Sequence, residues 1–174
     1  NASELVILAI GMTLVTASSG GQDISVGATM AIAGSVILRL VCGGQASADT
    51  MQMNLVLAVV IGIAVTALFG AFNGTLVAYF KIQPMVALIM YTAGRSIAAW
   101  INNNQLPIIN DLAFKYAGTF LPGIPVPTPI FITALVILAF WLALKFTTLG
   151  LYTQSVGINA NSSRLNGLDP KLIK

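Results

Sequence analysis

Long apolar runs dominate this sequence and limit what it can fold into. Five segments are apolar enough to be drawn as helices, at residues 3–17, 24–41, 55–80, 85–101 and 129–146. Segments of about 17–25 apolar residues cross a bilayer as helices. Of the 174 residues, 57% are hydrophobic and 7% are charged, whereas soluble domains carry about 25% charged residues. The sequence therefore predicts an all-α membrane protein, a polytopic bundle of transmembrane helices forming one domain over residues 1–174.

Residue types that are rare or missing exclude several classes of function. The chain has no His and a single cysteine, Cys42, so the usual zinc sites, an internal disulfide and His-dependent nucleophilic catalysis are excluded. A secondary transporter driven by an ion gradient would want carboxylates within its helices, and only Asp23 comes near one. The sequence contains no Gly-x-x-x-x-Gly-Lys-Ser/Thr loop for ATP. We therefore expect neither an enzyme nor a cofactor-binding protein.

The positive charges lie mostly between apolar runs, which suits membrane orientation better than nucleic-acid binding. One side of the membrane would carry Lys81, Lys145, Arg164, Lys171 and Lys174. The opposite side would carry Lys115 and Arg39. The positive-inside rule makes the first side cytoplasmic. It follows that residues 102–128 form an outer loop and residues 147–169 lie in the cytoplasm. No cleavable signal peptide is visible, and the chain opens in mid-pattern, so we expect a piece of a longer protein.

A glycine-rich break, SSGGQDISVG at Ser18–Gly27, separates the first two apolar segments. Two glycines free the backbone, and Asp23 can cap the helix that follows. One interpretation is a tight cytoplasmic turn. The other is a helix broken at membrane depth that lines a polar path, with Asp23 and Ser25 on the substrate side.

Two polar residues interrupt later apolar segments. Asn73 is expected more often to make an interhelical hydrogen bond than to contact a ligand. Arg95 lies about ten residues, or about 15 Å, into its segment, near the middle of the bilayer. Because a charge there costs at least ~2.5 kcal/mol, Arg95 should have an internal partner or border water. An internal structural pair and a place on the substrate path remain equal alternatives.

Small residues recur at four-residue spacing, which lets helix backbones approach closely in lipid. The stripes are Gly27, Ala31 and Ser35 in the second segment, and Ala58, Gly62, Thr66, Gly70 and Gly74 in the third. We interpret both as packing faces.

The long polar segment Thr147–Asp169 is either a connecting loop or a docking surface. We expect Gly157–Gly167 to form a short helix on the membrane surface, with Asn159 or a serine as N-cap and Gly167 as its end. Gly150 and Gly157 are expected to supply bends. Arg164, Ser163 and Asn159 would face a soluble partner, and Asn159 and Ser162 are short enough to lie close to its backbone.

Four separated motifs carry a resemblance to a known family. They are GMTLV at Gly11–Val15 with GGQDISVG at Gly20–Gly27, the Asn73–Gly74 pair, KIQPMVA at Lys81–Ala87, and LGLYTQSVGINANSSRLNGLD at Leu149–Asp169. In this order they resemble the permease subunits of bacterial sugar ABC importers of the ribose and galactofuranose type. One departure is Gln22, where those permeases usually have an aliphatic residue. The Asn-Gly pair, KIQP and VGIN lean towards the galactofuranose-type branch.

The resemblance implies a function and a set of partners. The chain would be the N-terminal portion of a multi-pass inner-membrane subunit that translocates a monosaccharide. It would pair with a second permease subunit, receive sugar from a periplasmic binding protein, and couple to a separate ATPase subunit that uses ATP–Mg. The coupling residues would be Gly157, Asn159, Ser162, Arg164 and Gly167. A branched-chain amino-acid ABC permease is the alternative within the same class.

Overall fold

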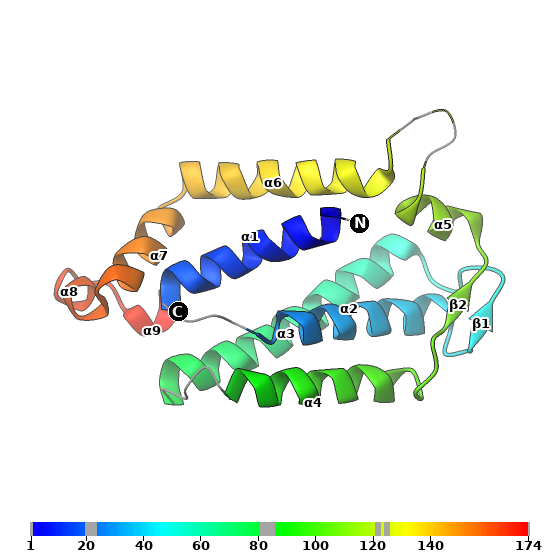
Figure 1. Ribbon diagram of the computed structural model, residues 1–174, viewed down its shortest axis with the longest axis horizontal. Helices are drawn as coiled ribbons and strands as arrows, with labels where there is room; N and C mark the ends of the chain where they lie inside the picture. The colour runs from blue at the N-terminus through cyan, green and yellow to red at the C-terminus, as the bar shows by residue number, and fades with distance from the viewer. Residues whose placement is uncertain (1, 20–23, 81–85, 121–122, 124–125, 174) are drawn as a thin grey trace.

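The computed structural model describes residues 2–19, 24–80, 86–120, 123 and 126–173, and it is largely helical (Figure 1). The five apolar segments form α1 (Ala2–Ser19), α2 (Val26–Val41), α3 (Leu55–Phe80), α4 (Val86–Ile101) and α6 (Thr128–Phe146). The bounds of these helices lie within two residues of the predicted ones. Apolar runs without internal proline or polar clusters leave little choice of where a helix begins and ends.

The long helices pack as two groups. In one, α2 lies between α3 and α4. In the other, α1 packs along α6 and against α7 (Leu149–Ile158). Thr133 on α6 joins that second group, since its hydroxyl donates to the carbonyl of Ser3 on α1 at 3.4 Å. Figure 1 shows α1 and α6 on one side of the molecule and α2 and α4 on the other.

Small residues allow the close approach within the first group. A Cβ on Gly94 of α4 would lie 2.7 Å from the Cβ of Ala28 on α2, and a Cβ on Gly62 of α3 would lie 2.7 Å from Cγ1 of Ile37. Only part of the predicted stripe on α3 is used in this way, because a Cβ on Gly70 or Gly74 would meet nothing within 4 Å in the described residues. The stripe on α2 faces α4, since Gly27 packs on the ring of Tyr91.

One end of the molecule contains structure that the sequence did not predict. Strands β1 (Ser47–Ala48) and β2 (Ile108–Ile109) pair in parallel, and β2 is followed by the short helix α5 (Leu112–Gly118). Cys42, Ala48 and Ile109 belong to a buried cluster that closes the ends of α2 and α3. The predicted outer loop is therefore a folded cap, held by pairing between two segments far apart in the sequence.

The opposite end holds α7, α8 (Ala160–Leu165) and α9 (Pro170–Ile173) (Figure 1). Here one prediction is wrong. Residues 149–158 form a helix, and Gly150 and Gly157 both lie inside it rather than at bends. The helix forms because α7 packs against α1, and tertiary packing can outweigh the low helix propensity of two glycines.

The apolar helices leave most of their side chains uncovered. Within the part of the chain that the structure describes, two helices are long and apolar enough to cross a membrane: Leu55–Tyr79 with mean hydropathy 2.7 and Thr128–Phe146 with mean hydropathy 2.2. In their most apolar stretches only 11% and 6% of the residues are buried. The core helix of a soluble protein would be largely buried, and a signal sequence would lie near the N-terminus. These exposed apolar surfaces are therefore suited to lipid or to other membrane helices.

Candidate functional site

The polar residues singled out in the helices gather along α2. Ser25 occupies the N-cap position of α2, and Asp23, which was predicted to cap this helix, lies outside the described residues. The hydroxyl of Ser25 accepts a hydrogen bond of 2.9 Å from the Nδ2 amide of Asn73 on α3. Both side chains are buried, with exposed fractions of 1% and 7%. Asn73 thus makes the interhelical hydrogen bond that was the favoured interpretation.

This bond also fixes where α2 begins relative to α3. Asn73 lies seven residues before Phe80, the last residue of α3, which corresponds to about 10 Å along the helix. The first turn of α2 therefore lies about two turns inside the end of α3 rather than level with it. Figure 1 shows the same inset start of α2.

Arg95 lies further along the same α2–α4 interface. Its Nη1 donates to the hydroxyl of Tyr91 at 2.9 Å, and the guanidinium lies 5.7 Å from the centre of that ring. The ring of Tyr91 in turn packs on Gly27 of α2. Arg95 has the partner expected of it, but that partner is on its own helix and the side chain is exposed. Among the described residues no carboxylate pairs with Arg95. Its hydrogen bond goes to Tyr91, whereas Asn73 and Ser25 bond to each other.

Sequence reasoning missed one residue beside Arg95. Asn102 follows α4, is 7% exposed, and its Oδ1 has no hydrogen-bond partner in the described structure. Asn102 and Arg95 line the same recess of about 280 Å³. Asn102 stands in a stretch of three asparagines, which is typical of a loop, so nothing in the sequence indicated that one of them is buried.

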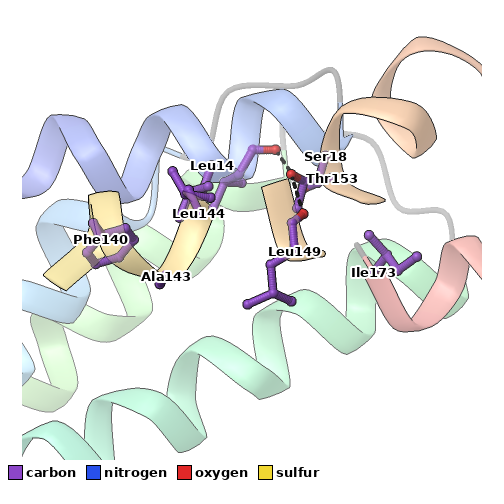
Figure 2. A pocket seen from close by; sticks show the side chains of 9 residues that line it. Leu14, Ser18, Phe140, Ala143, Leu144, Leu149, Thr153 and Ile173 are labelled. Carbon is purple, nitrogen blue, oxygen red and sulfur yellow. Dashed lines mark hydrogen bonds between the residues drawn. The ribbon is translucent and has the colours of Figure 1, made fainter. Parts of the chain in front are cut away.

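A second recess, of about 310 Å³, lies between α1, α6 and α7 (Figure 2). Leu14, Leu144 and Leu149 line it, and its two hydroxyls are used within their own helices. Ser18 Oγ donates to the carbonyl of Val15 at 3.1 Å, and Thr153 Oγ1 donates to that of Leu149 at 2.9 Å. The recess is therefore apolar and suits packing rather than recognition of a hydroxyl-rich ligand.

The polar end of the chain contains the short helix expected there, although it starts later than predicted. Asn159 is the N-cap of α8, and its Oδ1 accepts from the backbone N–H groups of Asn161 and Ser162, both at 3.1 Å. Gly167 ends the helix at φ 82°. Its N–H bonds to the carbonyl of Arg164, and that of Leu168 bonds to Ser163, the two bonds of a Schellman motif.

The predicted coupling residues have different structural roles. Gly157 belongs to α7, and a Cβ there would collide with the carbonyl oxygen of Ala17 at the end of α1. Ser162 and Arg164 are exposed on α8, whereas Ser163 was wrongly predicted to face a partner: it is buried, and its hydroxyl donates to the carbonyl of Asn159 at 3.0 Å. Two apolar neighbours were overlooked: Ile158 is 86% exposed and Leu165 is 90% exposed. No clear signal for them exists in the sequence, since single exposed aliphatic residues are normal on protein surfaces.

Comparisons with known proteins agree on the class of this chain. A family model described as "Branched-chain amino acid transport system / permease component" matches residues 1–174. The chain is 39% identical to the galactofuranose transporter permease protein YtfT of Escherichia coli K12, over 99% of this chain and 48% of that protein. It is 33% identical to the fructose import permease protein FruF of Bifidobacterium longum, over 98% and 47%.

A further relative points the same way. The chain is 33% identical to the ribose import permease protein RbsC of Escherichia coli K12, over 97% of this chain and 51% of that protein. The chain thus spans about half the length of the curated relatives it matches. No solved structure matches it. By the family match over residues 1–174 and the similarity to these relatives over 97–99% of its length, the chain belongs to the permease-component family of ABC importers, with ribose- and galactofuranose-type sugar permeases among its relatives.

Proposed function

We propose that this chain is part of the membrane-spanning permease subunit of an ABC importer that carries a monosaccharide across the bacterial inner membrane. The observation that carries the proposal is similarity to sugar permeases along 97–99% of the chain. The family description names branched-chain amino acids, whereas the relatives named above are sugar permeases. A ribose- or galactofuranose-like sugar is therefore favoured over an amino acid.

The proposed arrangement in the membrane is multi-pass. Five helices, α1, α2, α3, α4 and α6, would cross or enter the bilayer. The cap built on β1, β2 and α5 would face the periplasm, and α7–α9 would face the cytoplasm. Support comes from the opposite placement of these two ends in Figure 1 and from the exposed apolar surfaces of α3 and α6.

The substrate path would run beside α2. Ser25, Asn73, Arg95 and the neighbouring Asp23 are the proposed polar residues along it. The inset start of α2 supports this, because a helix end inside a bundle is tolerated where it lines a cavity. Since Ser25 and Asn73 bond to each other, a passing sugar would meet them by exchanging that bond.

The cytoplasmic end would couple the permease to ATP hydrolysis. In this proposal α8 docks on a separate ATPase subunit, which uses ATP–Mg, while a periplasmic binding protein and a second permease subunit complete the importer. Gly157, Asn159, Ser162, Arg164 and Gly167 are the proposed coupling residues, and the exposed Ile158 and Leu165 add apolar surface. Gly157 would act by seating α7 on α1, so that movement of α8 reaches the membrane helices.

Uptake into reconstituted vesicles tests the proposal. A transporter containing this chain would be assembled with its ATPase and binding protein, and labelled ribose, galactofuranose and leucine would be compared with and without internal ATP. We expect ATP-dependent uptake of one of the sugars. Uptake of leucine alone would support the branched-chain amino-acid alternative, and uptake driven by an ion gradient without ATP would contradict the ABC assignment.

A further inference from the structure

A polar recess lies at the end of α4, on the side of the molecule that carries the β1–β2 cap. Its volume is about 280 Å³, near the lower limit of about 300 Å³ that is typical of small-molecule sites. Its polar lining consists of Ser35 on α2, Arg95 on α4, and Asn102, Asn104 and Gln105 after α4. Alanines from both helices line much of the rest, and their small side chains leave room for a ligand.

Asn102 contains a polar atom that the described structure leaves unsatisfied. The side chain is more than nine-tenths buried, and its Oδ1 has no hydrogen-bond partner. A buried amide in this state is unfavourable unless another group supplies the hydrogen bond. A hydroxyl can satisfy an amide because it both donates and accepts a hydrogen bond.

Arg95 supplies fixed donors on the same recess. One N–H bonds to the hydroxyl of Tyr91 at 2.9 Å and the guanidinium lies over that ring, which restrains the side chain. The guanidinium has five N–H donors in a rigid fork. The remaining donors of Arg95 can therefore reach a ligand without a large ordering cost.

The chain after α4 is turned back to form the wall of the recess. Asn103 and Asn104 adopt left-handed conformations, with φ 53° and 57°, which Asn tolerates better than most residues. The N–H of Asn104 bonds to the carbonyl of Ala99 at 2.8 Å, and that of Gln105 bonds to the carbonyl of Asn102 at 2.9 Å. Asn104 and Gln105 thus lie against the end of α4 rather than leading away from it.

The lining selects a class of ligand. It offers one cation, three amides and one hydroxyl, and no carboxylate. Amides and hydroxyls outnumber the single charge, so a neutral ligand with several adjacent hydroxyls fits better than a strong anion. The recess lies towards the C-terminal end of α4, since Arg95 is only six residues from that end, about 9 Å along the helix. It is therefore distinct from the pair formed by Ser25 and Asn73 at the start of α2.

We propose that this recess is a hydroxyl-binding station for the transported monosaccharide, at the outer end of the path, with Asn102 and Arg95 as its principal hydrogen-bonding groups. The inference rests on the proposed function, since it assumes a sugar permease oriented with the β1–β2 cap outward. A sugar released from the binding protein would be held here before it passes along α2.

Asn102→Leu provides the test, since it keeps the approximate shape of the side chain and removes the amide. Because the amide oxygen is unsatisfied in the described structure, the variant should assemble normally and be no less heat-stable than the wild type. ATP-dependent sugar uptake in vesicles should fall about tenfold. This is roughly the effect of losing one hydrogen bond to a ligand that the charged Arg95 also contacts. Asn102→Ser supplies a hydroxyl in place of the amide and should retain more uptake than Asn102→Leu.

Asn110→Leu is the matched control at the same end of the molecule. Its amide bonds to Asp49 at 3.3 Å and does not line the recess, so uptake should stay near the wild-type rate. Direct binding can be followed by the fluorescence of Trp100, two residues from Asn102, while ribose, galactose or a sugar acid is added to the purified transporter. The sugars should change the signal in the wild type and not in Asn102→Leu.

The outcomes separate this inference from the proposed function. If the wild-type transporter takes up sugar and Asn102→Leu does so at an unchanged rate, the station is wrong and the permease assignment stands. If the transporter binds the sugar acid more strongly than the neutral sugars, and Arg95→Lys keeps that preference, the inference that the ligand is neutral is wrong. If no sugar is transported by the wild type under any condition, the proposed function fails and this inference fails with it.

Discussion

Arg95 is restrained by Tyr91 yet keeps an exposed guanidinium, a combination that fits a ligand contact better than a structural ion pair. Replacing it by Leu removes a charge that is costly in the membrane and breaks only the contact with Tyr91 among the described residues. We therefore expect Arg95→Leu to reach the membrane at normal levels and to assemble with the ATPase, while uptake falls at least about tenfold. Uptake assays beside immunoblots of membrane fractions measure both, and full transport would remove Arg95 from the path.

Cys42 lies just beyond α2 in the buried cluster beside the β1–β2 cap, fully shielded from solvent. Burial raises the pKa of its thiol, because the apolar surroundings disfavour the thiolate. At neutral pH less thiolate is available, so Cys42 should react with a maleimide at least about tenfold more slowly than a cysteine placed at exposed position 161. The rate should increase as the pH rises towards the raised pKa. Equal rates at the two positions would show that the cluster opens readily.

At the scale of elements, the Ser25–Asn73 bond joins the start of α2 to α3. Hydrogen bonds between membrane helices contribute about 0.6 kcal/mol on average and up to about 1.7 kcal/mol. We expect a double-mutant cycle with Ser25→Ala and Asn73→Ala to give a coupling energy in this range, measured by unfolding in detergent. A coupling energy of zero would mean that the two side chains act independently, and α2 would then need another anchor.

The contact of α7 with α1 depends on Gly157. Even a methyl group there would collide with the carbonyl of Ala17, so Gly157→Val should displace α7 and uncouple ATP hydrolysis from sugar uptake. Gly118→Ala is the control, because a Cβ at Gly118 meets nothing within 4 Å in the described structure. Both rates are measured in the same vesicles. Normal transport by Gly157→Val would show that α7 need not be seated on α1.

Arg164 tests the outer face of α8 without disturbing its packing, since the side chain is exposed. Its planar fork can bond a carboxylate across an interface. Arg164→Glu should therefore uncouple ATP hydrolysis from uptake while the subunit stays in the membrane. If both this variant and Gly157→Val transport and assemble normally, the segment after α6 has no role in coupling to the ATPase.

At the scale of the whole molecule, the two ends of the helical bundle should face opposite sides of the membrane. In a Cys42→Ala background, single cysteines would be placed between residues 113 and 119 on α5 and at position 161 on α8. An impermeant thiol reagent added to intact cells whose periplasm is accessible should label the α5 positions and leave position 161 unlabelled. Labelling of position 161 from outside would reverse the proposed orientation.

The sequence by itself determined the helices, because their information is local. Long apolar runs specify α1, α2, α3, α4 and α6 without reference to the rest of the chain. The ends of α8 are equally local: an Asn that bonds the first free N–H groups and a Gly that adopts a positive φ are readable within one short segment. Composition likewise excluded zinc and His-dependent chemistry from the residue types alone.

The tertiary structure decided everything that depends on which segments meet. The pairing of β1 with β2 joins residues separated by two long helices, and no local pattern encodes that register. Gly157 is a close contact rather than a hinge only because α1 lies against it. Asn102 is indistinguishable in sequence from Asn103 and Asn104, yet it alone of the three is buried. Burial is a property of the surrounding helices, so the recess that it lines could be recognised only once α2 and α4 were placed together.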